Sequence, residues 1–452
     1  MAAEQNVERG NWNSKLGFVL AAAGSAVGLG NIWRFPGEVA EGGGAAFIIV
    51  YLVCCFLVGF PVMAAELTIG RATGKNPVGA FKALSKSKFF PFVGFWGVLC
   101  GFMILSFYTV VAGWTLSFFF EEIFYFIGNE QLVNYFSQLD NGLKNAIFSS
   151  LFMIATIQII TGGVSDGIER VTKVLMPFLL VILIIMIGYV ITLDGAEKGL
   201  ELYLKPDFSK VTTDVMFDAM GQAFFSLSLG MGALITYGSY LDRKSDIPQA
   251  AAYVTLADIS VAVIAGLLII PAMFVAEASG IAIFAESGAL KSSTTLVFDV
   301  LPQLFHTMSP IVGLLFGGTF FLLLSMAALT STISLLEVPV SYVIDERGWR
   351  RKSAAWALGG TILAISLIIS FDIGLIDFID TIFSTVGLPL GGLLIALFVG
   401  YIWTTNNALM EMEDGTENFD KSFFYKFWPY FIKYISPILI GIVFIRTIME
   451  LF

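Results

Sequence analysis

The sequence predicts an all-α polytopic membrane protein with eleven transmembrane helices, ten of them in two five-helix repeats of opposite orientation. Three observations lead to this fold class: an apolar composition, eleven long apolar segments, and interruptions in the first and sixth of these segments. Hydrophobic residues make up 57% of the 452 residues and charged residues only 13%. A soluble core of this length could not bury so much apolar surface, so we expect a multi-pass protein in the lipid bilayer.

Each apolar segment is long enough to cross the membrane, which takes about 20 residues of helix. The segments lie at 14–37, 43–70, 89–123, 145–163, 170–192, 215–241, 248–277, 309–344, 354–370, 376–404 and 429–450. The predicted organisation is a cytoplasmic N-terminal segment at 1–13, a first repeat at 14–192, an external loop at 193–214, a second repeat at 215–404, a cytoplasmic loop at 405–428 and a last helix at 429–452.

Lysine and arginine determine the predicted orientation, because cytoplasmic segments carry most of these residues in membrane proteins. With the N-terminus inside, most of the 25 Lys and Arg residues lie in cytoplasmic segments, and Arg34 alone lies within the membrane. We therefore expect a plasma-membrane protein with a cytoplasmic N-terminus and an external C-terminus. The net charge of −10 lies in loops, and no nucleic-acid partner is expected.

The first apolar segment is interrupted by the sequence GSAVGLGNIWRFP at 24–36. Gly24, Gly28 and Gly30 weaken the helix, and Asn31 and Arg34 are costly at bilayer depth, since hydrocarbon offers no hydrogen-bond partner. Such a stretch is typical of a helix that is broken around a solute or ion. Taken alone, the Gly24-x-x-x-Gly28 spacing is equally consistent with close helix packing.

The sixth segment contains a second interruption, SLSLGMG at 226–232. Each repeat contains five helices, and this odd number reverses the direction in which the second repeat enters the membrane. Paired interruptions of this kind predict a binding site at the middle of the membrane. The N–H groups of half-helices attract a carboxylate, and unwound carbonyl groups suit a hard cation such as Na⁺.

Other polar residues within apolar segments are Asp258, Glu66 and Gln222. An intramembrane carboxylate such as Asp258 is a functional-site hypothesis. For Glu66 and Gln222, a structural polar network is at least as well supported as ligand contact. The hydroxyl groups of Ala327–Thr332 (AALTST) could also bond back to their own helix.

The segment 276–308 is either an ordinary external loop or a short hairpin that caps an outer vestibule. His306, the only histidine of the chain, is expected to be a loop residue without a functional role. The three cysteines lie in apolar segments, and no disulfide is expected.

Four stretches make the chain resemble the neurotransmitter:sodium symporter family, in particular its bacterial members that transport leucine and other hydrophobic amino acids. They are W-x-S-K-L-G-F at 12–18, GSAVGLGNIWRFP at 24–36, GQAFFSLSLGMGALITYGSY at 221–240 and AALTS at 327–331. These motifs are long and specific, and in order they extend over most of the chain.

The resemblance implies two sodium sites and no resident cofactor. The ligands of the first sodium ion would be the substrate carboxylate together with Ala26, Asn31, Ser226 and Asp258. Those of the second would be carbonyl groups of Gly24, Val27 and Ala327 and the hydroxyl groups of Thr330 and Ser331. A substrate carboxylate that completes the first sodium shell couples the two affinities.

The resemblance also implies how an amino acid would be held. Its carboxylate would accept from the N–H groups of Leu29 and Gly30 and from the Tyr108 hydroxyl. Its amino group would face Ser25, Ala26, Phe225, Ser226 and Ser228, and the pocket wall would consist of Ile104, Val111, Phe225, Ser228, Met231, Ser331 and Leu335. Amine-transporting relatives carry Asp at the position of Gly28, so glycine here favours a substrate that brings its own carboxylate.

Two departures from the family pattern affect the expected ions and the helix count. A leucine-transporting member has Asn at the position of Asp258 and Glu at that of Ala262, where chloride-dependent animal relatives have Ser. Because Asp258 can supply the negative charge, no chloride is expected. Many relatives have a twelfth helix, whereas this sequence ends with the eleventh, which lies outside the ten-helix core.

Two gates are implied as well. Arg34 with Asp377 would close the outer side, with Asp380 the less suitable partner. Arg9 with Asp345 would close the cytoplasmic side, the alternative being unpaired loop charges.

The predicted function is sodium-coupled import of a hydrophobic L-amino acid, aromatic ones included, by alternating access. The alternative substrate is another carboxylate or sulfonate, such as glycine, a β- or γ-amino acid, or taurine. A ligand-gated channel would need a continuous polar lining, a sensor would need a signalling domain, and an enzyme would need a catalytic constellation; the sequence indicates none of these. The oligomeric state is not predicted.

Overall fold

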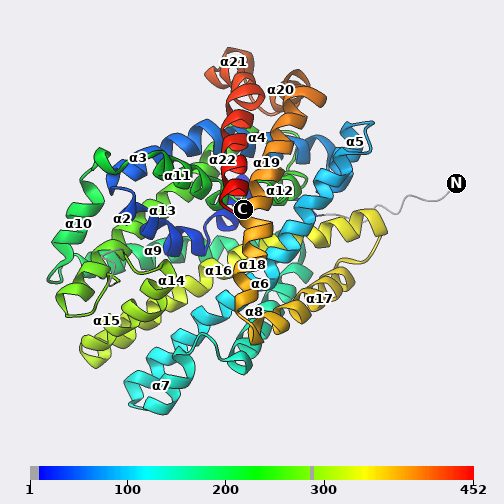
Figure 1. The fold of residues 1–452 in the computed structure, drawn as a ribbon. Helices are drawn as coiled ribbons and strands as arrows, with labels where there is room; N and C mark the ends of the chain where they lie inside the picture. Colours follow the sequence, from blue (N-terminus) through cyan, green and yellow to red (C-terminus); the bar gives the residue numbers. More distant parts are fainter. Residues whose placement is uncertain (1–9, 286–289, 452) are drawn as a thin grey trace.

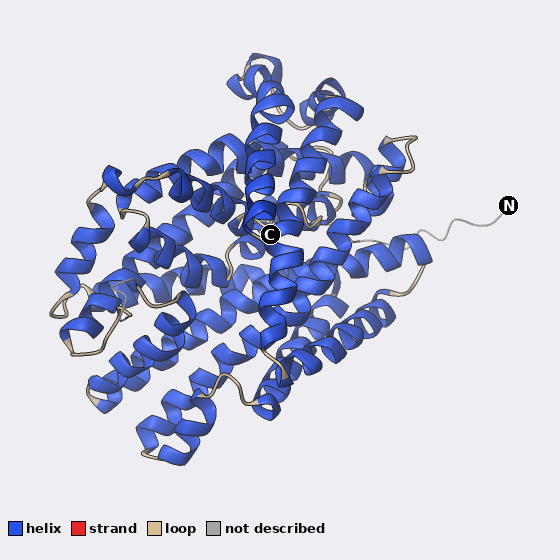
Figure 2. Ribbon diagram, in the orientation of Figure 1, coloured by secondary structure: helices blue, strands red, loops and turns tan. Residues whose placement is uncertain are grey.

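The computed structural model describes residues 10–285 and 290–451, and helices joined by short loops make up nearly all of them (Figure 2). Within these ranges, nine helices are long and apolar enough to cross a membrane. They are Ala45–Thr73 (α3 to α4), Phe90–Ile127 (α6), Gly142–Thr161 (α8), Val164–Val190 (ending in α9), Ile247–Ala278 (α13), Pro310–Arg347 (α16), Arg351–Phe371 (α17), Gly374–Ile402 (α18 and α19) and Phe423–Glu450 (α21 and α22).

The first predicted span is broken at the expected place. α1 (Lys15–Ala26) and the following helix Gly30–Glu41, which ends in α2 (Phe35–Glu41), meet at an angle of 54°. Counted as one span, this pair raises the number of candidate spans to ten. Gly30–Arg34 forms a wider π-helical turn just after the break.

The sixth predicted span is broken as well. α11 (Thr213–Ser226) and α12 (Ala233–Gly238) are separated by an unwound stretch, Leu227–Gly232. Ser228, Gly230 and Gly232 have φ angles of 53°, 83° and 77°. Two of these left-handed positions are occupied by glycine, which adopts them without steric cost. Both α11 and α12 are too short to cross a membrane alone, so the total of eleven spans remains a prediction.

Two groups of helices surround the breaks. α6, α8, α16 and α17 pack against one another and run side by side as a slanted layer (Figure 1). α1, α12, α13 and α4 form a second group, in which α1 packs on α13 and α12 on α4. α1 and α12 also pack on α16, so both broken helices lie where the two groups meet.

Short helices occupy the connections that the sequence indicated only as loops. α10 (Ala196–Leu204) lies within the predicted external loop and α20 (Thr405–Glu413) within the predicted cytoplasmic loop. α5 (Pro77–Leu84) and α7 (Glu130–Ser137) precede and follow α6. The last span begins at Phe423, before the expected residue 429.

The segment that follows α13 folds back over the helix ends as α14 (Ser293–Thr295), a π-helical turn at Leu296–Val300, and α15 (Leu301–Thr307). Phe298 of this capping segment packs edge-on against Trp33 and Trp114. The capping interpretation of residues 276–308 therefore holds for the described part, whereas residues 286–289 lie outside it. The expectation that His306 lies in a loop is wrong, because this residue belongs to α15.

Candidate binding site at the helix breaks

Hydrogen bonds hold the two breaks against each other. The Ser228 hydroxyl donates to the carbonyl of Ser25 at 2.9 Å, and the Gln222 amide donates to the carbonyl of Gly30 at 3.4 Å. The N–H of Gly230 donates to the buried carboxylate of Glu66 at 2.8 Å. Glu66 and Gln222 thus bond to backbone groups at the breaks, as expected if they form a structural polar network.

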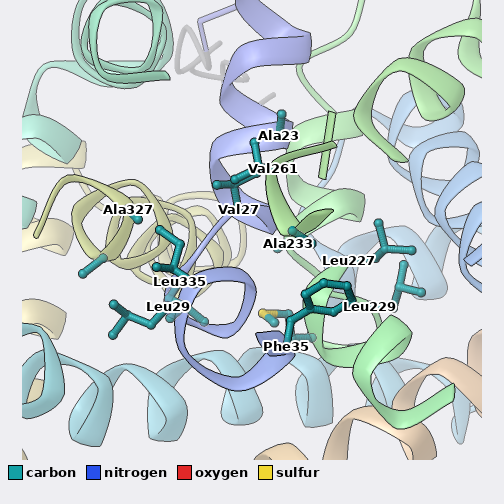
Figure 3. Close-up of a cluster of buried hydrophobic side chains, with 14 of the residues drawn as sticks. Ala23, Val27, Leu29, Phe35, Leu227, Leu229, Ala233, Val261, Ala327 and Leu335 are labelled. Atoms are coloured by element: carbon teal, nitrogen blue, oxygen red, sulfur yellow. The ribbon is translucent and has the colours of Figure 1, made fainter. Parts of the chain in front are cut away.

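Apolar side chains flank the breaks on several sides (Figure 3). Val27 and Leu29 come from the first break, Leu227 and Leu229 from the second, and all four are buried. Ala327 and Leu335 face them from α16 (Figure 3). Because this packing excludes water, the polar groups within it interact more strongly with a ligand than they would in solvent.

A pocket lies between the breaks, and all but two of the predicted substrate-binding residues line it. The predicted residues found in the pocket lining are Ser25, Ala26, Gly28, Gly30, Ile104, Tyr108, Phe225, Ser226, Ser228, Met231, Ser331 and Leu335. Leu29 and Val111 line the adjoining vestibule instead. Asn31, Ser334 and Leu388 complete the pocket, and no residue in this lining carries a charged side chain.

Gly28 provides space within this pocket. A Cβ atom at this position would lie 2.7 Å from the Ser331 hydroxyl oxygen and 3.0 Å from the Tyr108 hydroxyl oxygen. The N–H of the next residue, Leu29, donates to the Tyr108 hydroxyl at 3.2 Å. The two groups predicted to bind a carboxylate are therefore adjacent.

A buried polar cluster brings together the three side chains predicted for the first sodium site. The Ser226 hydroxyl donates to the Asp258 carboxylate at 2.8 Å, and the Asn31 amide nitrogen lies 2.7 Å from Asp258 Oδ1 and 3.1 Å from Ser226 Oγ. All three are buried. Ala26 lines the same pocket as Asn31 and Ser226.

The sequence analysis missed Tyr51 in this cluster. Its hydroxyl lies 3.3 Å from both Ser226 Oγ and Asp258 Oδ2, and the side chain is fully buried. Its position in the middle of an apolar span could have indicated a polar contact, because a buried phenol group usually has a hydrogen-bond partner.

The orientation of Asn31 bears on how a cation would be bound. Its oxygen accepts from the N–H of Gly28 at 3.1 Å, and its nitrogen faces Asp258. Sodium ligation by this residue would require the amide to turn its oxygen toward the ion, because only oxygen atoms coordinate a hard cation.

The residues predicted for the second sodium site lie where α1 packs on α16. A Cβ atom at Gly24 would lie 3.2 Å from the Cβ of Thr330, and Val27 and Ala327 are fully buried. The Thr330 hydroxyl donates to the carbonyl of Ala327 at 2.9 Å, as expected of a threonine that bonds back to its own helix. Two predicted ligands therefore already contact each other.

A vestibule with a volume of about 640 Å³ adjoins the pocket. Gly30, Tyr108 and Phe225 line both cavities, so the two aromatic side chains lie at the boundary. Arg34 lies above the Phe225 ring, 5.7 Å from its centroid, and its ion pair is with Glu38 at 3.2 Å. Asp377 and Asp380 also line the vestibule.

Further polar contacts connect the residues around the end of α12 with Trp12 and α16. The indole N–H of Trp12 donates to the carbonyl of Tyr237 at 3.1 Å, and the Tyr240 hydroxyl donates to Glu337 at 2.6 Å. Arg351 contacts both oxygens of the buried Glu337, at 2.7 and 2.8 Å. This bidentate pair was not predicted, although the Arg-rich stretch at 347–352 provides a partner for a carboxylate buried in α16.

The predicted inner gate is described only in part. Asp345 accepts hydrogen bonds from the backbone and side-chain nitrogens of Asn76, at 2.8 and 3.0 Å. Arg9 lies outside the described residues, so the Arg9–Asp345 pair remains a prediction.

Comparisons with known proteins agree with this geometry. The model of the sodium:neurotransmitter symporter family matches residues 9–135 and 131–452. The sodium-dependent transporter YhdH of Bacillus subtilis is 34% identical, with 97% of each chain aligned. The sodium-dependent transporter MJ1319 of Methanocaldococcus jannaschii is 33% identical, over 96% of this chain and 89% of its own. Human sodium- and chloride-dependent GABA transporter 2 is 26% identical, over 82% and 67%.

A solved structure of the same fold is that of MhsT in complex with L-phenylalanine. It is 43% identical and superimposes with a TM-score of 0.84, covering 97% of this chain and all of the MhsT chain. The predicted inverted-repeat transporter fold is thereby confirmed. The chain therefore belongs to the sodium:neurotransmitter symporter family and is a sodium-dependent membrane transporter, not an enzyme.

Proposed function

We propose that this transporter imports a hydrophobic L-amino acid, aromatic ones included, together with sodium and without chloride. The observation that carries the proposal is the uncharged pocket between the two breaks, which combines apolar walls with carboxylate-binding groups at one end. A pocket of this kind holds an apolar side chain and fixes its orientation through few polar contacts. The 43% identical MhsT has been solved in complex with L-phenylalanine, which is a hydrophobic, aromatic amino acid.

The geometry supports a specific pose for the substrate. Its carboxylate would accept from the N–H of Leu29 and the hydroxyl of Tyr108, which now contact each other at 3.2 Å. Gly28 leaves room beside this pair. Carbonyl groups freed at the breaks, such as that of Ala26, would accept from the amino group.

Sodium would bind at two places as a co-transported ion. The first is the cluster of Asn31, Ser226 and Asp258, where oxygen ligands and a buried negative charge suit a hard cation. The second lies between α1 and α16, at Gly24 and Thr330. If the substrate carboxylate completes the first sodium shell, each ligand increases the affinity for the other by the same factor.

In this proposal, transport does not require chloride because Asp258 supplies the negative charge. The carboxylate lies inside the first sodium cluster and is fully buried, so it compensates the charge of a nearby sodium ion without an added anion.

The test is uptake of radiolabelled L-phenylalanine into proteoliposomes with an imposed sodium gradient. We expect uptake that stops when potassium replaces sodium and persists when gluconate replaces chloride. Competition by the twenty amino acids, GABA and taurine would then define the substrate. Competition by GABA or taurine alone would favour the alternative substrate class, and loss of uptake in gluconate would contradict the role of Asp258.

A further inference from the structure

A second cluster of ionisable side chains lies apart from the transport site, where the end of α6 meets α15. Glu121 and Glu122 belong to α6, and His306 to α15. His306 Nε2 lies 3.4 Å from Glu121 Oε1 and 3.6 Å from Glu122 Oε2. One nitrogen and two carboxylate oxygens therefore converge from two elements that are far apart in the sequence.

The carboxylates of this cluster are buried without sufficient partners. The side chains of Glu121 and Glu122 are only 2% and 1% exposed. Both oxygens of Glu122, one oxygen of Glu121 and Nε2 of His306 have no hydrogen-bond partner. Within the described part of the chain, the ion-pair partner of both carboxylates is His306. Burying a carboxyl group without a partner is costly, and a bound cation would provide a partner for both of these groups.

We propose that Glu121, Glu122 and His306 form a binding site for a divalent transition-metal ion of the Zn²⁺ class. Zn²⁺ binds histidine nitrogen and carboxylate oxygen at about 2.0–2.2 Å, so neighbouring ligands of a tetrahedral ion lie roughly 3.4 Å apart. The two nitrogen–oxygen distances match this spacing, and all three ligand atoms lie within 4.8 Å of one another. A water molecule would occupy the fourth position.

Two neighbours position the ligands. The Tyr125 ring stacks on the imidazole of His306 at 3.5 Å between centroids, and the Tyr125 hydroxyl donates to the carbonyl of His306. The second neighbour is Gly317 of α16, where a Cβ atom would lie 2.5 Å from Glu122 Oε1. A side chain at this position would displace the carboxylate of Glu122.

A bound ion would fasten the capping segment to α6. Ser293 and Thr294, in α14 of the same segment, line the vestibule. The site is separate from the substrate pocket, so its existence does not depend on the proposed substrate.

The single histidine permits a direct test. Protein purified without a polyhistidine tag and labelled with ¹³C only at the Cε1 atom of histidine gives one imidazole resonance, which Zn²⁺ should shift at micromolar concentration. Ca²⁺ should leave the resonance unchanged, because it prefers oxygen ligands. We expect Glu122→Gln and Glu121→Gln each to weaken Zn²⁺ binding at least about tenfold.

The neighbouring glycines provide a matched pair that keeps all three ligands. Gly317→Ala should weaken binding by displacing Glu122, whereas Gly318→Ala should not, since a Cβ there would meet only Phe119 at 3.9 Å. A resonance that responds to protons but not to millimolar Zn²⁺ would overturn the proposal. A Zn²⁺ shift of equal affinity in both carboxylate variants would overturn it too, because His306 alone would then bind the ion.

Discussion

Gly28 shows how the absence of a side chain selects a substrate. The Ser331 and Tyr108 hydroxyl oxygens would lie within about 3 Å of any Cβ at this position. Glycine therefore leaves a space that a ligand could fill. An aspartate here would place a second carboxylate beside the N–H of Leu29, where the substrate carboxylate is proposed to bind. In the proposed pose, this one position therefore restricts the substrate by both volume and charge.

We expect Gly28→Ala to weaken L-phenylalanine binding by about tenfold, or about 1.4 kcal/mol, because overfilling a packed site typically costs 1–3 kcal/mol. Gly28→Asp should weaken it further. The measurement is the L-phenylalanine concentration that gives half of the maximal thermal stabilisation in sodium buffer. Gly221→Ala is the matched control, since a Cβ there meets nothing within 4 Å. Equal affinities for Gly28→Ala and Gly221→Ala would contradict the proposed pose.

Among the elements, the unwound stretch Leu227–Gly232 depends on side chains from other helices. Its freed backbone groups cannot bond within a helix, and the N–H of Gly230 is satisfied by Glu66 of α4 (Phe60–Thr73). At the first break, the buried Gln222 donates to the carbonyl of Gly30, which also accepts from the N–H of Phe35. Each break is therefore stable only in the context of the assembled bundle.

Glu66→Leu should lower the unfolding temperature, because an orphaned buried N–H costs about 1–3 kcal/mol. Glu66→Gln, which keeps an acceptor oxygen, should lower it less. Thermal unfolding of the purified protein would rank the variants, with Glu413→Leu at an exposed position as the control. An unchanged unfolding temperature for Glu66→Leu would mean that Gly230 finds another acceptor.

The sequence predicted the broken elements well because glycine and charge within an apolar segment are local signals. Short connecting helices such as α10 and α15 were not predicted, since their stability comes from packing on the spans rather than from a long apolar pattern. At the site, motif residues such as Asn31 and Ser226 were placed correctly together. Leu388 was missed because an apolar residue in an apolar span carries no sign of the face it occupies.

For the whole molecule, alternating access requires that contacts on the two sides of the pocket differ between states. In this structure a vestibule adjoins the pocket at Tyr108 and Phe225, and Trp12, Tyr240 and Glu337 make hydrogen bonds outside the lining of both cavities. The bidentate Arg351–Glu337 pair is buried, and such a pair is costly to break. Arg34, by contrast, is 44% exposed and can exchange partners.

Arg34 is therefore predicted to pair with Glu38 when the vestibule is open and with Asp377 when it closes. Exposed pairs contribute only about 0–1 kcal/mol, so the exchange costs little. Arg34→Glu and Asp377→Arg should each reduce L-phenylalanine uptake at least about tenfold, and the double variant should recover part of the loss. Glu38→Gln, which removes only the open-state partner, should retain most uptake. If the double variant transports no better than either single variant, and a swap with Asp380 also fails, then Arg34 does not form the outer gate through these carboxylates.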